Sequence, residues 1–172
     1  ENTKLLKQKL NFNLDIGNRH FRMDWHGNPI QSFSENLMTA LPSEEVVKSL
    51  YNIFYSSNVC HFIKSSIKSD FIIYNARPFR SLLHSTTASG PQDWHFDNCP
   101  PGLVRAILYL TDVDKKSGCF EYKDNDDIIH SVEGDAGLFF LFDANKLLHR
   151  GKPPVRKERK VIDFVIGPRI PN

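Results

Sequence analysis

Cysteine is scarce in this 172-residue sequence, and no long apolar run occurs in it. Three cysteines are an odd number and lack metal-type spacing, which argues against a disulfide framework and favours reduced thiols. They are Cys60, Cys99 and Cys119. The longest apolar run, residues 136–142, is far too short to span a bilayer. These scarcities exclude a disulfide-stapled scaffold and a helical membrane protein.

Charge of one sign is also lacking, since the net charge is only +2. So small an excess does not by itself imply nucleic acid or a membrane surface as partner. The polar N-terminal stretch shows no signal-peptide pattern, although a leader removed before Glu1 stays open. An apolar content of 40% with 13 Phe indicates a well-filled core. We expect one soluble, cytoplasmic domain over residues 1–172, and oligomeric state is not predicted.

Two kinds of hydrophobic periodicity divide the chain. A helical pattern starts at Ser43 and continues to Phe54, and a weaker one spans about residues 57–67. A period-two pattern over residues 8–25 predicts a β-hairpin. Further predicted strands are residues 71–74, 94–98, 103–111, 119–122, 128–132, 137–142, 146–149 and 159–166. Short strands separated by Gly, Pro and Asp turns predict a mainly β fold, with flanking N-terminal helices packed on one sheet of a jelly roll whose core covers about residues 70–168.

The sequence Trp-His-Phe-Asp at residues 94–97 contains the first candidate for a metal site. In an extended strand His95 and Asp97 lie on the same face. A second imidazole from a distant strand, for which His149 is the candidate, would complete the two-histidine, one-carboxylate ligand set of non-haem Fe(II) oxygenases. Taken alone the motif carries little weight, because a chain with seven histidines can contain it by chance. An ordinary core or surface role for His95 stays open at this point.

Two later strands each carry polar side chains on one face. Arg105 and Tyr109 share a face, which requires a polar lumen if the strand is buried and solvent if it is not. Arg159 shares a face with Asp163. A guanidinium is well suited to bind a carboxylate through two parallel hydrogen bonds, but a solvated basic turn would explain Arg159 as well.

The order of these parts resembles that of the 2-oxoglutarate- and Fe(II)-dependent oxygenases. The parts are a His-x-Asp motif, a Tyr-Leu strand with a Gly-containing turn, Gly-Asp-x-Gly before a hydrophobic strand, Leu-His-x-Gly, and a basic residue. Residues 105–120 (RAILYLTDVDKKSGCF) look like the prolyl-hydroxylase branch. Residues 147–159 (LLHRGKPPVRKER) are equally similar to the phytanoyl-CoA dioxygenase branch. The resemblance covers about residues 90–168.

This resemblance implies a double-stranded β-helix, which is a jelly roll, and roles for five residues. His95, Asp97 and His149 would be the catalytic Fe(II) ligands. Arg159 would pair with the distal carboxylate of 2-oxoglutarate, and Tyr109 would hydrogen-bond the same carboxylate. The implied cofactors are Fe(II), 2-oxoglutarate as cosubstrate and O2, with ascorbate as a candidate reductant. The implied reaction is hydroxylation with succinate and CO2 as co-products, because Asp97 stands where halogenating relatives leave room for halide.

The branch and the substrate stay open, because the chain departs from both patterns. Ser117-Gly118 stands where prolyl-type enzymes have a Gly-Gly pair, and residues 123–127 replace the Pro-Gly-Ser-His turn of phytanoyl-type enzymes. The substrate is expected to be a small molecule or a residue of a peptide or protein. Basic residues that could hold an anionic group, unless they are ordinary surface arginines, are Arg77, Arg80 and Arg105. Trp94 could line the substrate slot or simply pack.

Two rival functions remain at the level of sequence. The first is a non-catalytic jelly-roll or cupin-like module that binds a metal or a ligand, against which the intact ligand set and Arg159 count. The second is a nucleic-acid dealkylating enzyme, suggested by the basic run at residues 156–160. The near-neutral charge counts against it. We therefore expect no nucleic-acid partner and no membrane partner.

Overall fold

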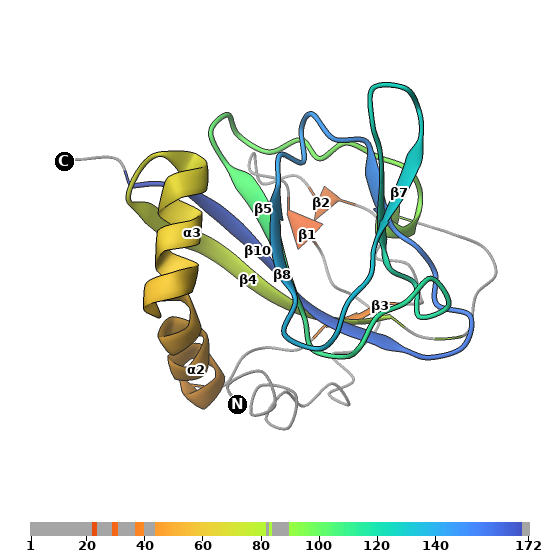
Figure 1. The fold of residues 1–172 in the computed structure, drawn as a ribbon, viewed down its shortest axis with the longest axis horizontal. Coiled ribbons are helices and arrows are strands. Elements are labelled where there is room, and N and C mark those ends of the chain that lie inside the picture. The colour runs from red at the N-terminus through yellow and green to blue at the C-terminus, as the bar shows by residue number, and fades with distance from the viewer. Residues whose placement is uncertain are drawn as a thin grey trace.

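The chain folds into two facing β-sheets, with a pair of helices against the outer side of the larger sheet (Figure 1). This computed structural model describes residues 22–23, 29–30, 37–39, 44–81, 83 and 90–169. The helices are α2 (Glu44–Phe54), α3 (Ser57–Ile67) and the 3-10 turn η1 (Gly90–Gln92). The strands are β1 (Arg22–Met23), β2 (Pro29–Ile30), β3 (Leu37–Thr39), β4 (Phe71–Ser81), β5 (Val104–Tyr109), β6 (Phe120–Lys123), β7 (Ile129–Val132), β8 (Phe139–Phe142), β9 (His149–Gly151) and β10 (Arg159–Pro168).

Strand β10 is the centre of the larger sheet, whose order is β3-β4-β10-β5-β8. It pairs antiparallel with β4 on one side and with β5 on the other, so that Asp163 lies between Arg77 and Ile107. The smaller sheet has the order β7-β6-β9, and β1 and β2 form a separate antiparallel pair. Antiparallel strands that alternate between two facing sheets form the predicted jelly roll. None of the helices in the described part of the chain has the length and apolarity that a bilayer crossing needs.

Each face of the larger sheet has its own apolar core. The outer core packs Phe54 of α2 against Leu108 of β5 and Phe164 of β10, with none of these three side chains more than 2% exposed. The inner core joins Tyr109 of β5 to Phe120 of β6, and thereby holds the two sheets together. Side chains alternate along a strand, so β5 and β10 each contribute residues to both cores. The predicted helices on one side of a mainly β fold are confirmed.

Most of the predicted elements are present with shifted ends. Both helices are confirmed, while the expected helix start at Ser43 lies outside the described residues. The predicted hairpin over residues 8–25 also lies outside them, apart from β1. The strand predicted at residues 146–149 begins only at His149 and continues to Gly151.

Two strand predictions were wrong, one in its extent and the other in its existence. The strand predicted at residues 71–74 continues to Ser81, through Pro78. Pro78 fits into this strand because of its position in the ladder. The N–H and C=O groups of even-numbered β10 residues point to β5 and away from β4, as the hydrogen bond from Leu110 N to Lys160 O shows. Pro78 lies opposite Ile162, so its missing N–H points away from β10 and breaks no ladder bond there.

The second error concerns residues 94–98, which do not form a strand. Within this segment only His95 makes a β-bridge, with His149 of β9. Asp97 N donates to Ala144 O at 2.9 Å and keeps the segment extended as it leaves β9. The ladder does not continue toward Asp97, because the residues opposite 96–98 are 148–146, which precede β9. Two neighbouring bonds are nevertheless enough to fix the direction of both side chains.

Candidate metal centre

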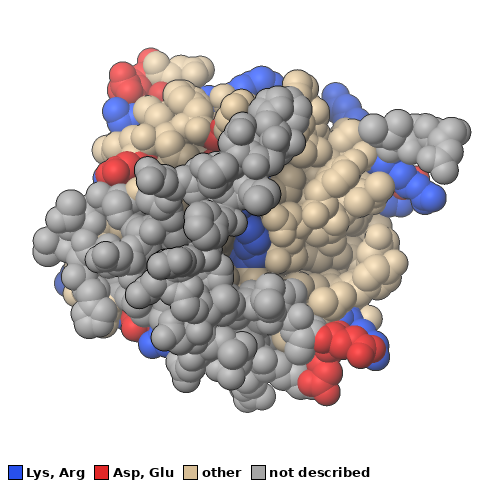
Figure 2. All heavy atoms as spheres, turned by 180° about the vertical axis from the view of Figure 1, so that it is seen from behind, with Lys and Arg blue, Asp and Glu red and all other residues tan. Residues whose placement is uncertain are grey.

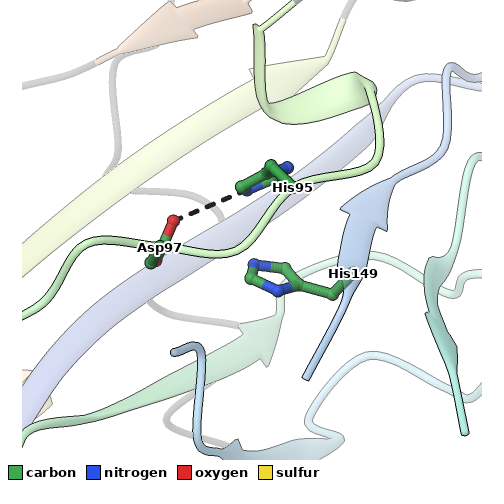
Figure 3. Close-up of side chains that lie close together, drawn as sticks. All are labelled: His95, Asp97 and His149. Atoms are coloured by element: carbon green, nitrogen blue, oxygen red, sulfur yellow. Dashed lines mark ion pairs between the residues drawn. The ribbon is translucent and has the colours of Figure 1, made fainter. Parts of the chain in front are cut away.

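His95 and His149 are paired directly across a two-residue ladder. The backbone N–H of each donates to the carbonyl oxygen of the other at 3.0 Å. Their rings therefore lie on the same side, with centroids 4.4 Å apart. The Asp97 side chain projects to the same side from two residues further on, and Figure 3 shows all three groups converging. Their candidate ligand atoms all lie within 4.8 Å of one another, as predicted for a shared face.

The backbone also fixes which ring nitrogen of each histidine carries the proton. Nδ1 of His95 lies 2.7 Å from Asp93 O, and Nδ1 of His149 lies 2.7 Å from Leu147 O. A carbonyl oxygen only accepts, so each Nδ1 is the protonated nitrogen and each Nε2 presents a lone pair. Burial lowers the pKa of His149 and favours its neutral imidazole. Both rings are oriented as metal ligands require.

The Asp97 carboxylate lies between the histidines and an arginine. Its Oδ1 is 3.5 Å from His95 Nε2, and its Oδ2 is 3.1 Å from Arg105 Nε. The second contact is an ion pair and not an aligned hydrogen bond, so Oδ2 is buried without a hydrogen-bond donor among the described residues. Arg105 in turn contacts Asp163 at 2.9 Å, and the same Asp163 oxygen accepts from Arg77 at 2.6 Å. A chain of alternating charges thus ends at Asp97.

These three side chains fit a divalent transition metal. Two neutral Nε2 atoms and one carboxylate oxygen converge on one point. The set matches the two-histidine, one-carboxylate arrangement that non-haem Fe(II) prefers, and it leaves the other coordination positions open. Asp97 Oδ1 faces His95 Nε2 at 3.5 Å and is the oxygen that a bound cation would take, while Oδ2 stays beside Arg105.

The triad lines a cavity of about 370 Å³ between the two sheets. Arg105, Tyr109 and Arg159 also line this cavity, as the strand parity predicted. Trp94 and Arg80 do not. Trp94 lies under the guanidinium of Arg150 and Arg80 pairs with Glu158 at 2.8 Å, and neither is a cavity residue.

Arg159 is a buried cation, with only 7% of its surface exposed. Its guanidinium donates to Gly118 O through Nη1 and to Ser81 Oγ at 3.3 Å through Nη2. No carboxylate of the described residues pairs with it, and its Nε has no partner there. Burial lowers its pKa. Because an unpaired buried cation is costly, this end of the cavity is suited to an anion.

Two glycines help to place that guanidinium, one by leaving space and the other through its carbonyl. A Cβ on Gly151 would lie 2.6 Å from Arg159 Nη2, so only glycine leaves the space. Gly118 has a φ of +76°, which favours glycine, and its carbonyl is turned toward Arg159. Of the two positions 117 and 118, it is therefore position 118 at which the backbone of this turn requires glycine.

Tyr109 is fully buried in the cavity wall, but its hydroxyl is already engaged. It donates to Val132 O at 2.8 Å and accepts from Phe120 N at 3.0 Å. Burial raises the pKa of Tyr109 to about 12, so the hydroxyl keeps its proton at neutral pH. Donation to a cosubstrate carboxylate would require the proton to leave Val132. Tyr109 therefore links the two sheets in the described structure.

Gln92 is a cavity residue that the sequence did not reveal. It is only 1% exposed, and neither atom of its amide has a hydrogen-bond partner among the described residues. Its turn, η1, contacts β9, which carries His149. In the sequence Gln92 follows Gly90-Pro91, and nothing there distinguishes it from an ordinary turn residue. A buried amide with two unsatisfied atoms needs a ligand or an ordered water.

No protein-family model matches the sequence, and no curated protein matches it either. Solved structures do match the fold. The non-haem α-ketoglutarate-dependent epimerase SnoN from nogalamycin biosynthesis covers 84% of this chain and 68% of its own, with 14% identity and a TM-score of 0.63.

The non-haem monooxygenase ThoJ, solved as its nickel complex, covers 70% of this chain at 17% identity and a TM-score of 0.57. This chain spans only 54% of ThoJ. HygX from Streptomyces hygroscopicus, solved with nickel, 2-oxoglutarate and hygromycin B, covers 79% of this chain and 71% of its own, with 13% identity and a TM-score of 0.52. At these identities the likeness establishes a shared jelly-roll fold.

Proposed function

We propose that this chain is an Fe(II)- and 2-oxoglutarate-dependent dioxygenase that hydroxylates a small molecule. The observation that carries the proposal is the placement of the His95, Asp97 and His149 triad in the same cavity as Arg159, a buried cation without a carboxylate partner. HygX, which shares the fold, has been solved with a divalent metal and 2-oxoglutarate bound. That precedent supports the assignment of the two cofactors.

In this proposal the chain's own groups hold and orient the reactants. His95 and His149 offer Nε2 lone pairs, because their Nδ1 protons are held by backbone carbonyls. Asp97 offers a carboxylate oxygen while Arg105 restrains the other. Arg159 binds the distal carboxylate of 2-oxoglutarate with its guanidinium. When bound, the iron with 2-oxoglutarate and O2 supplies the oxidising chemistry that inserts one oxygen atom into a substrate C–H bond and leaves succinate and CO2.

Aromatic side chains pack around the ring of His149. Phe120 stacks on His149 with centroids 5.5 Å apart and planes 25° apart, and Phe142 approaches the same ring edge-on at 4.9 Å. Gln92 supplies one amide donor and one acceptor to whichever polar group fills the cavity. The packing around His149 and the polar groups of Gln92 preorganise the site for its ligands.

Calorimetric titration tests the proposal through binding alone. Mn(II), a stand-in for Fe(II) that does not turn over, should bind the wild type, and 2-oxoglutarate should then bind the Mn(II)-loaded protein. His149→Ala should lose Mn(II). Arg159→Met should keep Mn(II) and lose 2-oxoglutarate. The matched control is His130→Ala, because His130 pairs with Asp124 and is not a cavity residue. Mn(II) affinity that survives in His149→Ala would overturn the assignment.

A further inference from the structure

Four charged side chains alternate along one wall of the cavity. They are joined in the order Arg77, Asp163, Arg105 and Asp97. Both arginines contact the same atom, Asp163 Oδ2, at 2.6 and 2.9 Å. One carboxylate oxygen is therefore shared by two guanidinium groups. In this series of ion pairs Asp97 is the member that belongs to the triad, and Arg77 is at the opposite end.

The formal charge of the cavity is uneven. Of the described residues that line it, three are arginines, two are aspartates and the histidines are neutral, which leaves one positive charge. A bound Fe(II) would add two positive charges and a bound 2-oxoglutarate two negative ones, so the same single positive charge remains for the next ligand. A buried or half-buried excess charge is unfavourable unless a counterion is supplied.

This excess is located at Arg77. In the proposed complex the positive charge of Arg159 is neutralised by 2-oxoglutarate, and the negative charge of Asp97 by the metal and Arg105. The single negative charge of Asp163 is then shared between Arg77 and Arg105. Arg77 has only 18% of its side chain exposed, and its Nε–H is buried without a hydrogen-bond partner among the described residues.

Besides Asp163, Arg77 has apolar side chains next to it on the cavity wall. Its guanidinium carbon lies 5.5 Å from the centroid of the Phe79 ring, and Phe79 and Ile107 both line the cavity. Viewed from behind, the molecule has a hollow near the middle of its face with Lys or Arg atoms at the bottom (Figure 2). A ligand beside Arg77 would meet a cation and an apolar wall together.

We propose that Arg77 is a subsite for the carboxylate of the substrate, and that the substrate is a small monocarboxylate with an apolar body. This inference rests on the proposed function, because the charge count assumes bound Fe(II) and 2-oxoglutarate. A single carboxylate balances the remaining positive charge, whereas a dianion would exceed it. The apolar body lies against Phe79 and Ile107, which line the same cavity as Arg77 and the triad.

Matched pairs of ligands test this inference. The protein loaded with Mn(II) and 2-oxoglutarate is titrated with octanoate and phenylacetate, and with their neutral amides octanamide and phenylacetamide. We expect the wild type to bind each acid at least about tenfold more tightly than its amide, which corresponds to about 1.4 kcal/mol. Arg77→Met should lose this preference while retaining its affinity for Mn(II) and 2-oxoglutarate. Arg77→Lys, which keeps the charge, should retain part of it.

Arg80→Met is the control, because Arg80 is on the same strand but pairs with Glu158 outside the cavity. It should keep the full preference. Equal binding of acid and amide by the wild type, an unchanged preference in Arg77→Met, or no binding of either acid to the loaded protein would overturn the inference. Failure to bind Mn(II) or 2-oxoglutarate would instead overturn the proposed function and this inference with it.

Discussion

Trp94 and Arg150 lie opposite each other on the reverse side of the ladder that pairs His95 with His149. The guanidinium carbon of Arg150 is 4.4 Å from the centroid of the Trp94 ring, at a distance typical of a cation–π contact. Arg150 also donates to Glu121 at 2.9 and 2.7 Å, which holds it against the neighbouring strand β6. This contact therefore stabilises, from outside the cavity, the spacing of the two histidines inside it.

Trp94→Leu should weaken metal binding without removing a ligand. The substitution keeps apolar bulk but removes the aromatic face, so the segment that carries His95 loses its contact with Arg150. We expect Mn(II) affinity to fall on the order of tenfold, at the lower end of the losses seen when groups behind metal ligands are changed. Calorimetric titration measures it. Tyr51→Leu, an exposed aromatic on α2, is the control, and an equal loss in both variants would contradict this role for Trp94.

Gly151→Ala should abolish 2-oxoglutarate binding while Mn(II) still binds. The added Cβ would meet Nη2 of Arg159 at 2.6 Å and displace the guanidinium from its place. Gly102→Ala is the comparison, because a Cβ there meets no atom within 4 Å. Its φ of +84° makes it cost roughly 1–2 kcal/mol of stability but no affinity. Normal 2-oxoglutarate affinity in Gly151→Ala would show that Arg159 is not the anion site.

Asp163→Ala should destabilise the fold strongly. It leaves Arg77 and Arg105 facing each other without their shared carboxylate, and removing one partner of a buried ion pair typically costs about 3–5 kcal/mol. Urea unfolding followed by circular dichroism measures this loss. Glu44→Ala removes an exposed pair with Lys48 and should cost less than about 1 kcal/mol. Similar losses of unfolding free energy in the two variants would mean that the ion pairs of Asp163 contribute little to stability.

Acid should destabilise the metal-free protein through His149. Its pKa is lowered in the fold, mainly by burial, so below the ordinary histidine pKa of about 6.5 the unfolded chain binds the proton more readily than the folded one. The free energy of unfolding should therefore fall as the pH drops from 7.5 through 6.5. Urea unfolding of His149→Gln over the same range should show a smaller fall. Parallel curves for the two proteins would contradict this cause.

The side of the larger sheet that each residue faces was predictable, because alternation along a strand is a local property. Arg105 and Tyr109 face the cavity on β5, as Arg159 does on β10. The contacts of these groups were not predictable, because they depend on register between distant strands. Arg77 meets Asp163 only because β4 continues past the residues that looked like strand.

Two other features of the site also escaped prediction, each for its own reason. Trp94 faces away from the cavity because the direction of a side chain beside a two-residue ladder is set by its partner on β9. The backbone acceptors of the two histidine rings lie two residues upstream of each, at Asp93 and Leu147, and any residue type would provide them. A carbonyl group leaves no signature in a sequence.

Release of CO2 from 2-oxoglutarate labelled at C1 tests the central claim most directly. The account predicts that the wild type releases label under air when Fe(II) is present and that a chelator stops it, even without a substrate. Arg159→Met and His149→Ala should release label at the rate of Fe(II) alone. If the wild type binds Fe(II) and 2-oxoglutarate but releases no more label than these variants do, in the presence of octanoate or phenylacetate as well, the chain is a binding module and the account is wrong.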